Sequence, residues 1–232
     1  MSAVSKLIRV GHKGADHVAP GNTIESFQAA LEHGVDMIEF DVLRTGDGRL
    51  VLAHDGEDAA GREPLTLEEG LDHFAGEAYA GVELDVDLKL PGYEREVVDG
   101  LLKRSLGDRS LVSSMFTESL DRLGELAPGL RRGWSVPRIK RNWVRSPFAV
   151  PAYVVARVMR ARLPGQATVR IRAGGCEAIM ANRILASRRL VRAVHDAGGV
   201  LYVWTVDDPA RIQALERMGV DGVITNDPRL FG

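Results

Sequence analysis

The sequence predicts an α/β protein in which eight parallel strands, each followed by a helix, close into one (β/α)8 TIM barrel over residues 1–232. Two observations support this prediction: short apolar runs alternate with amphipathic segments along the chain, and about eight such pairs fit its 232 residues. A chain of this length can bury one large core. The alternation alone leaves an open, doubly wound sheet as an alternative.

Short apolar runs mark the strands, and segments with apolar residues at helical spacing mark the helices. The predicted strands cover residues 7–11, 37–43, a short extra strand at 50–53, 82–88, 110–113, 131–136, 178–181, 200–205 and 220–225. The predicted helices cover residues 23–33, 66–74, 93–105, 118–126, 187–198 and 209–218. Thr23, Thr66 and Ser187 stand where three of these helices need an N-cap. Residues 56–64 are polar and rich in glycine, which predicts a loop.

The strand at residues 82–88 has an unusual alternation. Glu83, Asp85, Asp87 and Lys89 share one face, whereas the other face is apolar. An exposed antiparallel strand would have this pattern, with its polar face in water. In a closed parallel barrel, the same face would point inward near the mouth.

The composition narrows the functional classes. The formal net charge of −2 gives no general argument for nucleic-acid binding. Cys176 is the single cysteine, so no disulfide can form within the chain. The first residues lack the apolar run of a signal peptide, so we expect a cytoplasmic protein. The glycine-rich phosphate-binding motifs of nucleotide enzymes are missing from the sequence.

Three carboxylates near predicted strand ends are candidate metal ligands. Glu39 and Asp41 share one face of a strand, about 7 Å apart along it, and Asp87 could join them from the next strand. Oxygen ligands of this kind favour a hard cation such as Mg²⁺ or Ca²⁺. The alternative is an ion pair with Lys89, because a buried carboxylate needs a positive partner.

Two histidines follow strands in the same region. His12 ends the first strand, and His54 ends the short extra strand. At the mouth of a barrel, where active sites lie, one imidazole could take a proton from a nucleophile while the other donates one to a leaving oxygen. A lone histidine is more often structural, so the prediction of catalysis depends on the pairing with candidate metal ligands.

Three further residues have two interpretations each. Lys89 could neutralise a phosphate or pair with Asp87. Trp204, at the end of a strand, could line a pocket or fill the core. Asn22 could contact a ligand or close a turn. For Trp204 and Asn22 the structural interpretation is the more common one.

A series of short motifs follows one order along the chain. They are H-K-G at residues 12–14, P-G-N-T at 20–23, E-F-D-V at 39–42, H-D at 54–55, D-L-K at 87–89, S-S-M-F at 113–116, V-W-T at 203–205 and G-V-D-G-V-I-T-N at 219–226. This series resembles the glycerophosphodiester phosphodiesterase family, which typically shows H-R-G, P-E-N-T, E-L-D-V, H-D, E-x-K, S-S-F, V-W-T and G-V-D-G-I-I-T-D. No single motif is decisive, but the ordered set spans nearly the whole chain.

The resemblance implies a (β/α)8 barrel and a metal-dependent phosphodiesterase that converts glycerophosphodiesters to an alcohol and glycerol 3-phosphate. One divalent cation, Mg²⁺ or Ca²⁺, is the implied cofactor. A neighbouring substrate hydroxyl can be the attacker in this family, giving a cyclic phosphate that water then opens. The implied site residues are the general acid–base pair His12 and His54, the cation ligands Glu39, Asp41 and Asp87, and the substrate-binding residues Lys13, Asn22, Lys89 and Trp204.

The chain departs from the family's pattern near the implied site. Lys13 stands where the family has arginine, which keeps the charge but loses the bidentate geometry. Gly21 and Asp87 each replace a glutamate, so one carboxylate is lost and another reaches less far. The segment 56–81 is a shortened insertion after the second strand, where the family often has a longer one that covers the site. We therefore expect an open mouth and a bulkier substrate.

The stretch 137–164 is basic and contains Trp143, Phe148 and Tyr153. It is interpreted first as an amphipathic barrel helix with a solvated basic face. The alternative is a surface for peripheral contact with anionic lipid membranes. Two rival functions remain beside the main one: a lysophospholipase D-like or phospholipase-like enzyme acting on lipid phosphodiesters, and a catalytically inactive barrel that binds phosphate ligands. The expected partner is a small-molecule phosphodiester or a lysolipid, and not nucleic acid.

Overall fold

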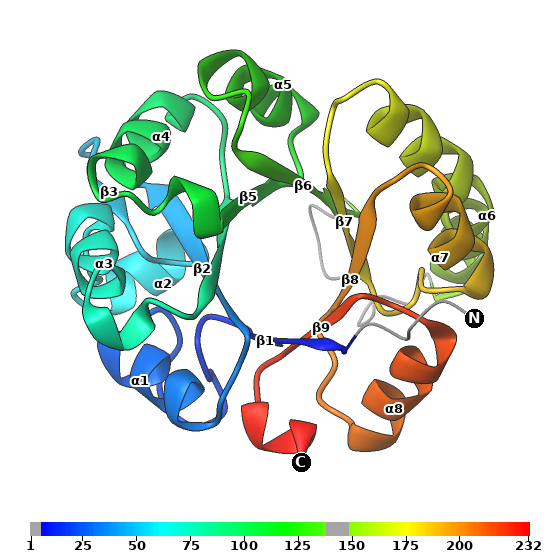
Figure 1. Cartoon of the computed structure of the whole chain (residues 1–232), viewed down its shortest axis with the longest axis horizontal. Helices are drawn as coiled ribbons and strands as arrows, with labels where there is room; N and C mark the ends of the chain where they lie inside the picture. The colour runs from blue at the N-terminus through cyan, green and yellow to red at the C-terminus, as the bar shows by residue number, and fades with distance from the viewer. Residues whose placement is uncertain (1–5, 138–148) are drawn as a thin grey trace.

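Eight parallel strands form a closed ring in the computed structural model, which describes residues 6–137 and 149–232, with side chains from residue 155 onward in the second range (Figure 1). In order around the ring they are β1 (Ile8–Gly11), β2 (Met37–Arg44), β4 (Glu83–Leu88), β5 (Ser110–Ser114), β6 (Arg131–Val136), β7 (Ala178–Asn182), β8 (Val200–Trp204) and β9 (Gly222–Thr225). Pairing of β9 with β1 closes the ring, from Ile8 opposite Gly222 to Gly11 opposite Thr225. The predicted barrel is confirmed, and the open sheet is wrong.

Helices surround the ring and follow the strands along the chain. They are α1 (Ile24–Glu32), α3 (Leu67–Phe74), α4 (Glu94–Lys103), α5 (Thr117–Leu126), α6 (Ala149–Arg172), α7 (Arg188–His195) and α8 (Pro209–Met218), with 3₁₀ turns η1 (Glu77–Tyr79), η2 (Gly107–Arg109) and η4 (Pro228–Phe231). The hydroxyls of Thr23, Thr66 and Ser187 accept hydrogen bonds from the first turns of their helices, as predicted.

The segment after β2 leaves the ring before the chain returns to β4. β3 (Leu50–Val51) pairs antiparallel with the end of β2, and α2 (Gly56–Gly61) follows it. The prediction of a loop at residues 56–64 is therefore wrong in part. The Asp55 carboxylate accepts hydrogen bonds from the backbone of Glu57 and Asp58, which starts a short helix that buries no side chain. Apolar periodicity could not reveal such a helix.

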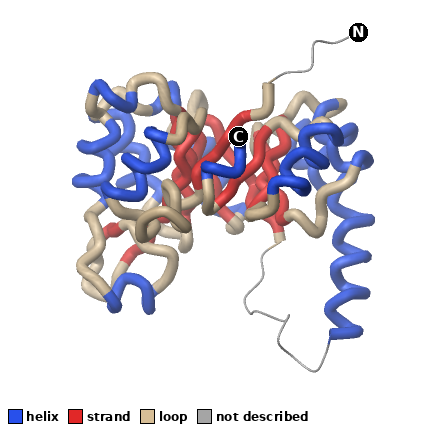
Figure 2. The backbone as a smooth tube through the Cα atoms, turned by 90° about the horizontal axis from the view of Figure 1, so that it is seen from below, coloured by secondary structure: helices blue, strands red, loops and turns tan. Residues whose placement is uncertain are grey.

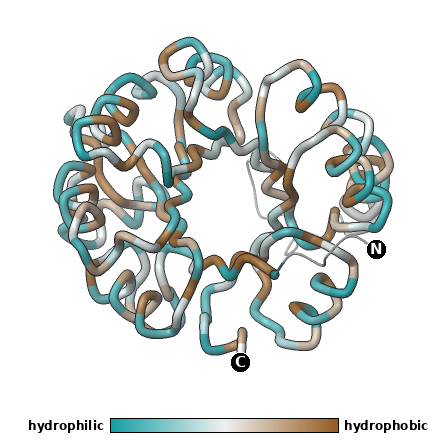
Figure 3. The backbone as a smooth tube through the Cα atoms, in the orientation of Figure 1, coloured by the Kyte–Doolittle hydropathy of each residue, from teal (hydrophilic) through white to brown (hydrophobic). Residues whose placement is uncertain are grey.

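Two apolar cores hold the barrel together. Outward-facing strand residues pack against the helices, as Phe40 of β2 does against Phe27 of α1, with ring centroids 6.1 Å apart. Figure 3 shows apolar residues concentrated along the strands and hydrophilic residues on the outer helix faces. A second core fills the ring itself and contains Val10, Met37, Leu111, Ala178, Met180, Tyr202 and Ile224.

Two segments extend beyond the carboxyl ends of the strands, at the end called the mouth below. Figure 2 shows the first half of α6 projecting there, across the barrel from β3 and α2. α6 begins at Ala149, so the basic stretch is helical from that residue, while residues 138–148 lie outside the described residues. Within the described ranges, no helix combines the length and the apolar composition that crossing a bilayer requires.

Candidate active site

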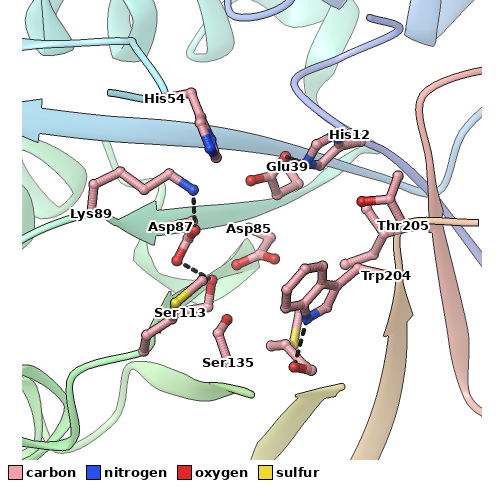
Figure 4. A pocket seen from close by; sticks show the side chains of 13 residues that line it. His12, Glu39, His54, Asp85, Asp87, Lys89, Ser113, Ser135, Trp204 and Thr205 are labelled. Carbon is pink, nitrogen blue, oxygen red and sulfur yellow. Dashed lines mark hydrogen bonds and ion pairs between the residues drawn. The ribbon is translucent and has the colours of Figure 1, made fainter. Parts of the chain in front are cut away.

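A cavity of about 150 Å³ lies inside the ring at its mouth (Figure 4). Its lining residues are His12, Glu39, His54, Asp85, Asp87, Lys89, Ser113, Met115, Ser135, Met180, Trp204, Thr205 and Ile224. The parallel register of β2 and β4 sets Glu39 beside Asp85 and Asp41 beside Asp87. Because side chains alternate along a strand, all four carboxylates point into the ring. The polar face predicted for residues 82–88 therefore points inward.

Glu39, Asp41 and Asp87 form one group of buried carboxylates. One oxygen atom from each carboxylate lies within 4.8 Å of the other two. The sequence predicted these three residues as one set of ligands, and the structure brings them together. A set made of oxygen donors alone fits a hard divalent cation.

Lys89 lies against the same carboxylates. Its Nζ forms ion pairs with Asp41 Oδ1 and Asp87 Oδ2, so the predicted pairing with Asp87 is present. The single charge of Lys89 thus lies beside three carboxylates, so the group keeps an excess of negative charge. The donor set therefore fits a divalent cation in charge as well as in chemistry.

The pKa values follow from this shared charge. Burial and the charge of Asp41 raise the pKa of Glu39 well above its usual range. Burial also acts to raise the pKa of Asp41, but Lys89 and the hydrogen bond with His54 outweigh it and hold that pKa well below its usual range. The carboxylates next to Lys89 keep the pKa of the lysine high in spite of its burial. Asp41 and Lys89 are thus a charged pair, whereas Glu39 lacks a full positive partner.

His12 is held from the far end of the chain. Its Nδ1 lies 2.6 Å from Asn226 Oδ1, and its Nε2 lies 3.9 Å from Glu39 Oε2. The Asn226 amide donates in turn to Asp207 Oδ2 at 2.7 Å. Burial is the main cause that lowers the pKa of His12 below 6.5.

His54 lies on the other side of Glu39 from His12 (Figure 4). Its Nδ1 is 3.4 Å from Asp41 Oδ2, and its side chain is 51% exposed. Its backbone N–H donates to Asp58 in α2, so the short helix positions this histidine. The structure therefore brings both predicted histidines to one cavity.

Two predicted substrate-binding residues, Lys13 and Asn22, are not part of the cavity lining. Asn22 is buried behind Asp41: its Nδ2 donates to Asp41 Oδ2 at 2.9 Å, and its Oδ1 accepts from the Asp41 backbone N–H at 3.0 Å. Lys13 donates its backbone N–H to Glu39 Oε2 at 2.8 Å, while its Nζ pairs with Asp16 Oδ2 at 2.8 Å. Both residues therefore position the carboxylates.

Gly21, where the family has glutamate, fits this arrangement. A Cβ added at residue 21 would lie 2.4 Å from Asp16 Oδ1 and 2.8 Å from Lys13 Cβ. The Gly21 backbone N–H also donates to Asp16 Oδ1 at 2.8 Å. The Asp16 carboxylate thus occupies the space that a side chain at residue 21 would need.

Trp204 lines the cavity opposite the carboxylates. Its Nε1 donates to the carbonyl oxygen of Met180 at 2.7 Å, which fixes the orientation of the ring. Met115, Met180 and Ile224 lie in the same lining. Trp204 therefore lines a pocket, which is one of its two predicted positions. The cavity has one acidic wall and one apolar wall.

Sequence reasoning assigned no role to Asp85, Asn226 or Asp207. The inward face of residues 82–88 was the available signal for Asp85, and the end of the last strand was the signal for Asn226. Burial and the charge of Asp87 raise the pKa of Asp85 to about 8, although Ser113 and Lys89 partly offset them. Asp85 is therefore a buried carboxyl group beside the candidate ligands.

Comparison with known proteins places the chain in one family. The model of the glycerophosphoryl diester phosphodiesterase family matches residues 12–88 and 62–230. The chain belongs to this family. As a member, it is a phosphoric diester hydrolase, and the predicted resemblance is confirmed.

Relatives and solved structures match along most of their lengths. The glycerophosphodiester phosphodiesterase of Caldanaerobacter subterraneus is 28% identical over 96% of this chain and 95% of its own. The Bacillus subtilis glycerophosphodiester phosphodiesterase is 26% identical over 97% and 85%. A phosphodiesterase of Oleispira antarctica, solved with the product sn-glycerol-3-phosphate, has a TM-score of 0.70 at 21% identity and covers 95% of this chain and 93% of its own. This structural likeness supports the barrel fold.

Proposed function

We propose that this chain hydrolyses glycerophosphodiesters to an alcohol and glycerol 3-phosphate, with one divalent cation and two histidines. The observation that carries this proposal is the meeting of His12, His54 and three buried carboxylates at one cavity. The complex of the Oleispira phosphodiesterase contains sn-glycerol-3-phosphate, and we transfer that product to this chain. The arrangement suits a reaction that needs charge neutralisation and two proton transfers.

Glu39, Asp41 and Asp87 would hold the cation, Mg²⁺ or Ca²⁺. When bound, the cation polarises the phosphoryl oxygens and balances negative charge. Asn22 keeps Asp41 in place through two hydrogen bonds, and Lys89 adds a positive charge that attracts the phosphate. These residues bind and orient the substrate.

We assign the general base to His12 from its hydrogen-bond partners. A carboxylate only accepts, so Asp207 fixes the NH₂ side of the Asn226 amide and turns Oδ1 toward His12. That oxygen also only accepts, so His12 carries its proton on Nδ1 and leaves Nε2 free to take one. Nε2 faces the candidate cation ligand Glu39. His12 would therefore take the proton of the attacking oxygen, from water or from a neighbouring substrate hydroxyl.

His54 would then be the general acid. Its Nδ1 faces the Asp41 carboxylate, an acceptor that holds the ring in one orientation. Its side chain is half exposed at the cavity, where a leaving alcohol departs to solvent. Protonation of the leaving oxygen by His54 completes the transfer that His12 begins.

A lipid phosphodiester such as a lysolipid is a second candidate substrate. Residues 126–195 contain 15 lysines and arginines but a single acidic residue, Glu177. α6 lies in this region and projects beyond the mouth (Figure 2). Its Val155 and Val158 are 56% and 43% exposed. Exposed aliphatic side chains within a basic region suit an anionic lipid surface, so we propose the membrane contact for the part of α6 from residue 155 onward.

Product release from a panel of glycerophosphodiesters and lysophospholipids tests the proposal. Each assay is run with EDTA, Mg²⁺ or Ca²⁺, on the wild type, on His12→Ala and on the control His33→Ala. His33 is an exposed histidine that ends α1. We expect cation-dependent release of glycerol 3-phosphate that is about 10²–10⁴-fold slower in His12→Ala and unchanged in His33→Ala.

Two further results bear on the same proposal. The cation is expected to raise the Tm of the wild type and of His12→Ala alike, because His12 is no cation ligand in the proposed site. Preferred turnover of lysolipids would replace the first candidate substrate with the second. Folded wild type that releases no product from any substrate with any cation would overturn the proposal.

A further inference from the structure

Asp85 lies in the cavity, and one of its oxygens has no partner there. It is 1% exposed, and in the register of the ring it stands between Glu39 of β2 and Leu111 of β5. Figure 4 shows its carboxylate between the acidic wall and Trp204. Its Oδ1 forms no hydrogen bond with any described residue. A buried polar atom without a partner costs folding free energy, which is recovered when a ligand supplies the missing hydrogen bond.

Asp85 shares neither the lysine nor the candidate cation site of the other carboxylates. Lys89 forms its ion pairs with Asp41 and Asp87. Among the described residues, the carboxylates close enough to share one cation are Glu39, Asp41 and Asp87, without Asp85. Asp85 is therefore placed for a different part of the ligand.

The chemistry around Asp85 selects a hydroxyl group. The free Oδ1 of Asp85 accepts a hydrogen bond, which a hydroxyl group can donate and the oxygens of an ionised phosphate diester cannot. Ser113 and Ser135 add hydroxyl groups to the same lining, and Trp204 and Met180 supply apolar surface. A polyol matches both walls, since its hydroxyls can face the polar side and its C–H groups the apolar side.

The position of Asp85 selects the same group. Asp85 precedes the candidate ligand Asp87 by two residues on β4, so it lies farther from the mouth, toward the end of the cavity that the core inside the ring closes. Leaving alcohols differ in size and need the open mouth. The constant part of the substrate therefore fits the closed end of the cavity.

We propose that Asp85 accepts a hydrogen bond from the terminal hydroxyl of the substrate's glycerol group, which makes the closed end of the cavity a polyol subsite. This inference rests on the proposed function and adds a specificity-determining residue to it. The subsite holds the group that stays on the phosphate. It leaves the choice of leaving alcohol to the mouth.

Two diesters with the same leaving alcohol test this subsite. One carries glycerol, and the other carries 1,2-propanediol, which lacks the terminal hydroxyl and keeps the neighbouring one. We expect the wild type to favour the glycerol diester by about 10- to 100-fold in kcat/KM, which corresponds to the cost of leaving one buried acceptor without a hydrogen bond. Asp85→Leu should lower kcat/KM for the glycerol diester alone and bring this ratio close to one.

Two variants serve as controls. Asp85→Asn keeps an acceptor oxygen of similar shape and should retain part of the preference. Glu83→Gln changes the preceding inward carboxylate of β4, which pairs with Arg131 and does not line the cavity, so the ratio should stay at the wild-type value. Asp85→Asn should melt at or above the Tm of the wild type, because it removes an unpaired buried carboxyl group.

The outcomes separate this inference from the proposed function. A wild type that hydrolyses both diesters equally, or an Asp85→Leu variant that loses both activities equally, overturns the subsite and leaves the function in place. If the wild type hydrolyses neither diester, the function fails. Calorimetric binding of glycerol 3-phosphate against 1,2-propanediol 1-phosphate then tests Asp85, with loss of the preference in Asp85→Leu and its partial retention in Asp85→Asn as the supporting result, and equal binding by the wild type as the contrary one.

Discussion

The carboxylates at the two ends of β2 differ in how far positively charged side chains balance their charge. At the amino end, Asp36 accepts hydrogen bonds from the Arg9 side chain, the Arg9 backbone and Lys6, at 2.9 to 3.1 Å. At the mouth, Asp41 shares Lys89 with Asp87. The Asp36 carboxylate, just before β2, thus has two positively charged partners, whereas at the other end of β2 the carboxylates outnumber the one lysine that pairs with them.

The pKa values record this difference. Hydrogen bonds and charge from Arg9 and Lys6 outweigh the effect of burial and lower the pKa of Asp36 to about 2. Burial and the charge of Asp41 raise the pKa of Glu39 instead. In a barrel of this kind the amino ends of the strands serve stability and the carboxyl ends carry the active site. At one end of β2 the charge is balanced within the protein, and at the other it is left for a ligand.

The largest expected effect is a difference in kcat/KM between variants at the two ends of β2. Asp41→Asn should lower kcat/KM for a glycerophosphodiester by about 10²–10³-fold, because it removes a proposed cation ligand and the partner of His54 and Lys89. Asp36→Asn is the matched control and should leave kcat/KM unchanged while lowering the free energy of unfolding by about 1 kcal/mol. Kinetics and urea denaturation of both variants measure this. Equal losses of activity in the two variants would contradict the division of roles.

A smaller expected effect is the loss of stability at low pH, which involves only Asp36 at the amino end of β2. Asp36 has a folded-state pKa of about 2, below its ordinary value of 3.8, so its carboxylate stabilises the fold above pH 3.8. That contribution is lost as the pH falls from 3.8 through 2. The difference in unfolding free energy between wild type and Asp36→Asn, about 1 kcal/mol at pH 6 after allowance for solvent screening, should therefore shrink below pH 3.8 and vanish below about pH 2. A difference that stays constant over this range would show that Asp36 acts without its charge.

The smallest expected effect extends the comparison to the outer surface. Arg188 begins α7 at the mouth and makes no ion pair with any described residue. Val155→Ser with Arg188→Gln should weaken sedimentation with anionic vesicles by about 1 kcal/mol for the lost charge, and leave hydrolysis of a soluble diester unchanged. Leu102→Ser with Arg95→Gln is the control on α4, where Leu102 is 57% exposed. Equal vesicle binding by wild type and both double variants would reject the lipid surface.

Local sequence patterns predicted much of the fold and part of the site. Apolar runs located the ring strands, and strand periodicity put Glu39, Asp41 and Asp87 on inward faces. Helix α2 was missed because the Asp55 cap starts it and it buries no side chain, so its sequence has no apolar periodicity. Lys13, Asn22 and His12 show a second limit of prediction from sequence, which concerns the contacts that a side chain makes.

Lys13 and Asn22 were predicted to bind substrate. In the structure their side chains contact Asp16 and Asp41, and the binding role stays a prediction. A motif gives the residue but not the direction of its side chain. The hydrogen bond between His12 and Asn226 joins residues separated by 214 positions, and no local pattern contains such a contact. The free oxygen of Asp85 is likewise a property of packing around the whole ring.

The pairing of β1 with β9 joins two residues of the site that are synthesised far apart in time. His12 leaves the ribosome early, but Asn226, which sets its proton, arrives only after β9 has been made. A nascent chain that holds the histidines and the carboxylates thus lacks the partner of His12 until β9 pairs with β1. If His12 is the general base that we propose, a chain cut before β9 should hold every proposed catalytic residue and still lack the oriented base.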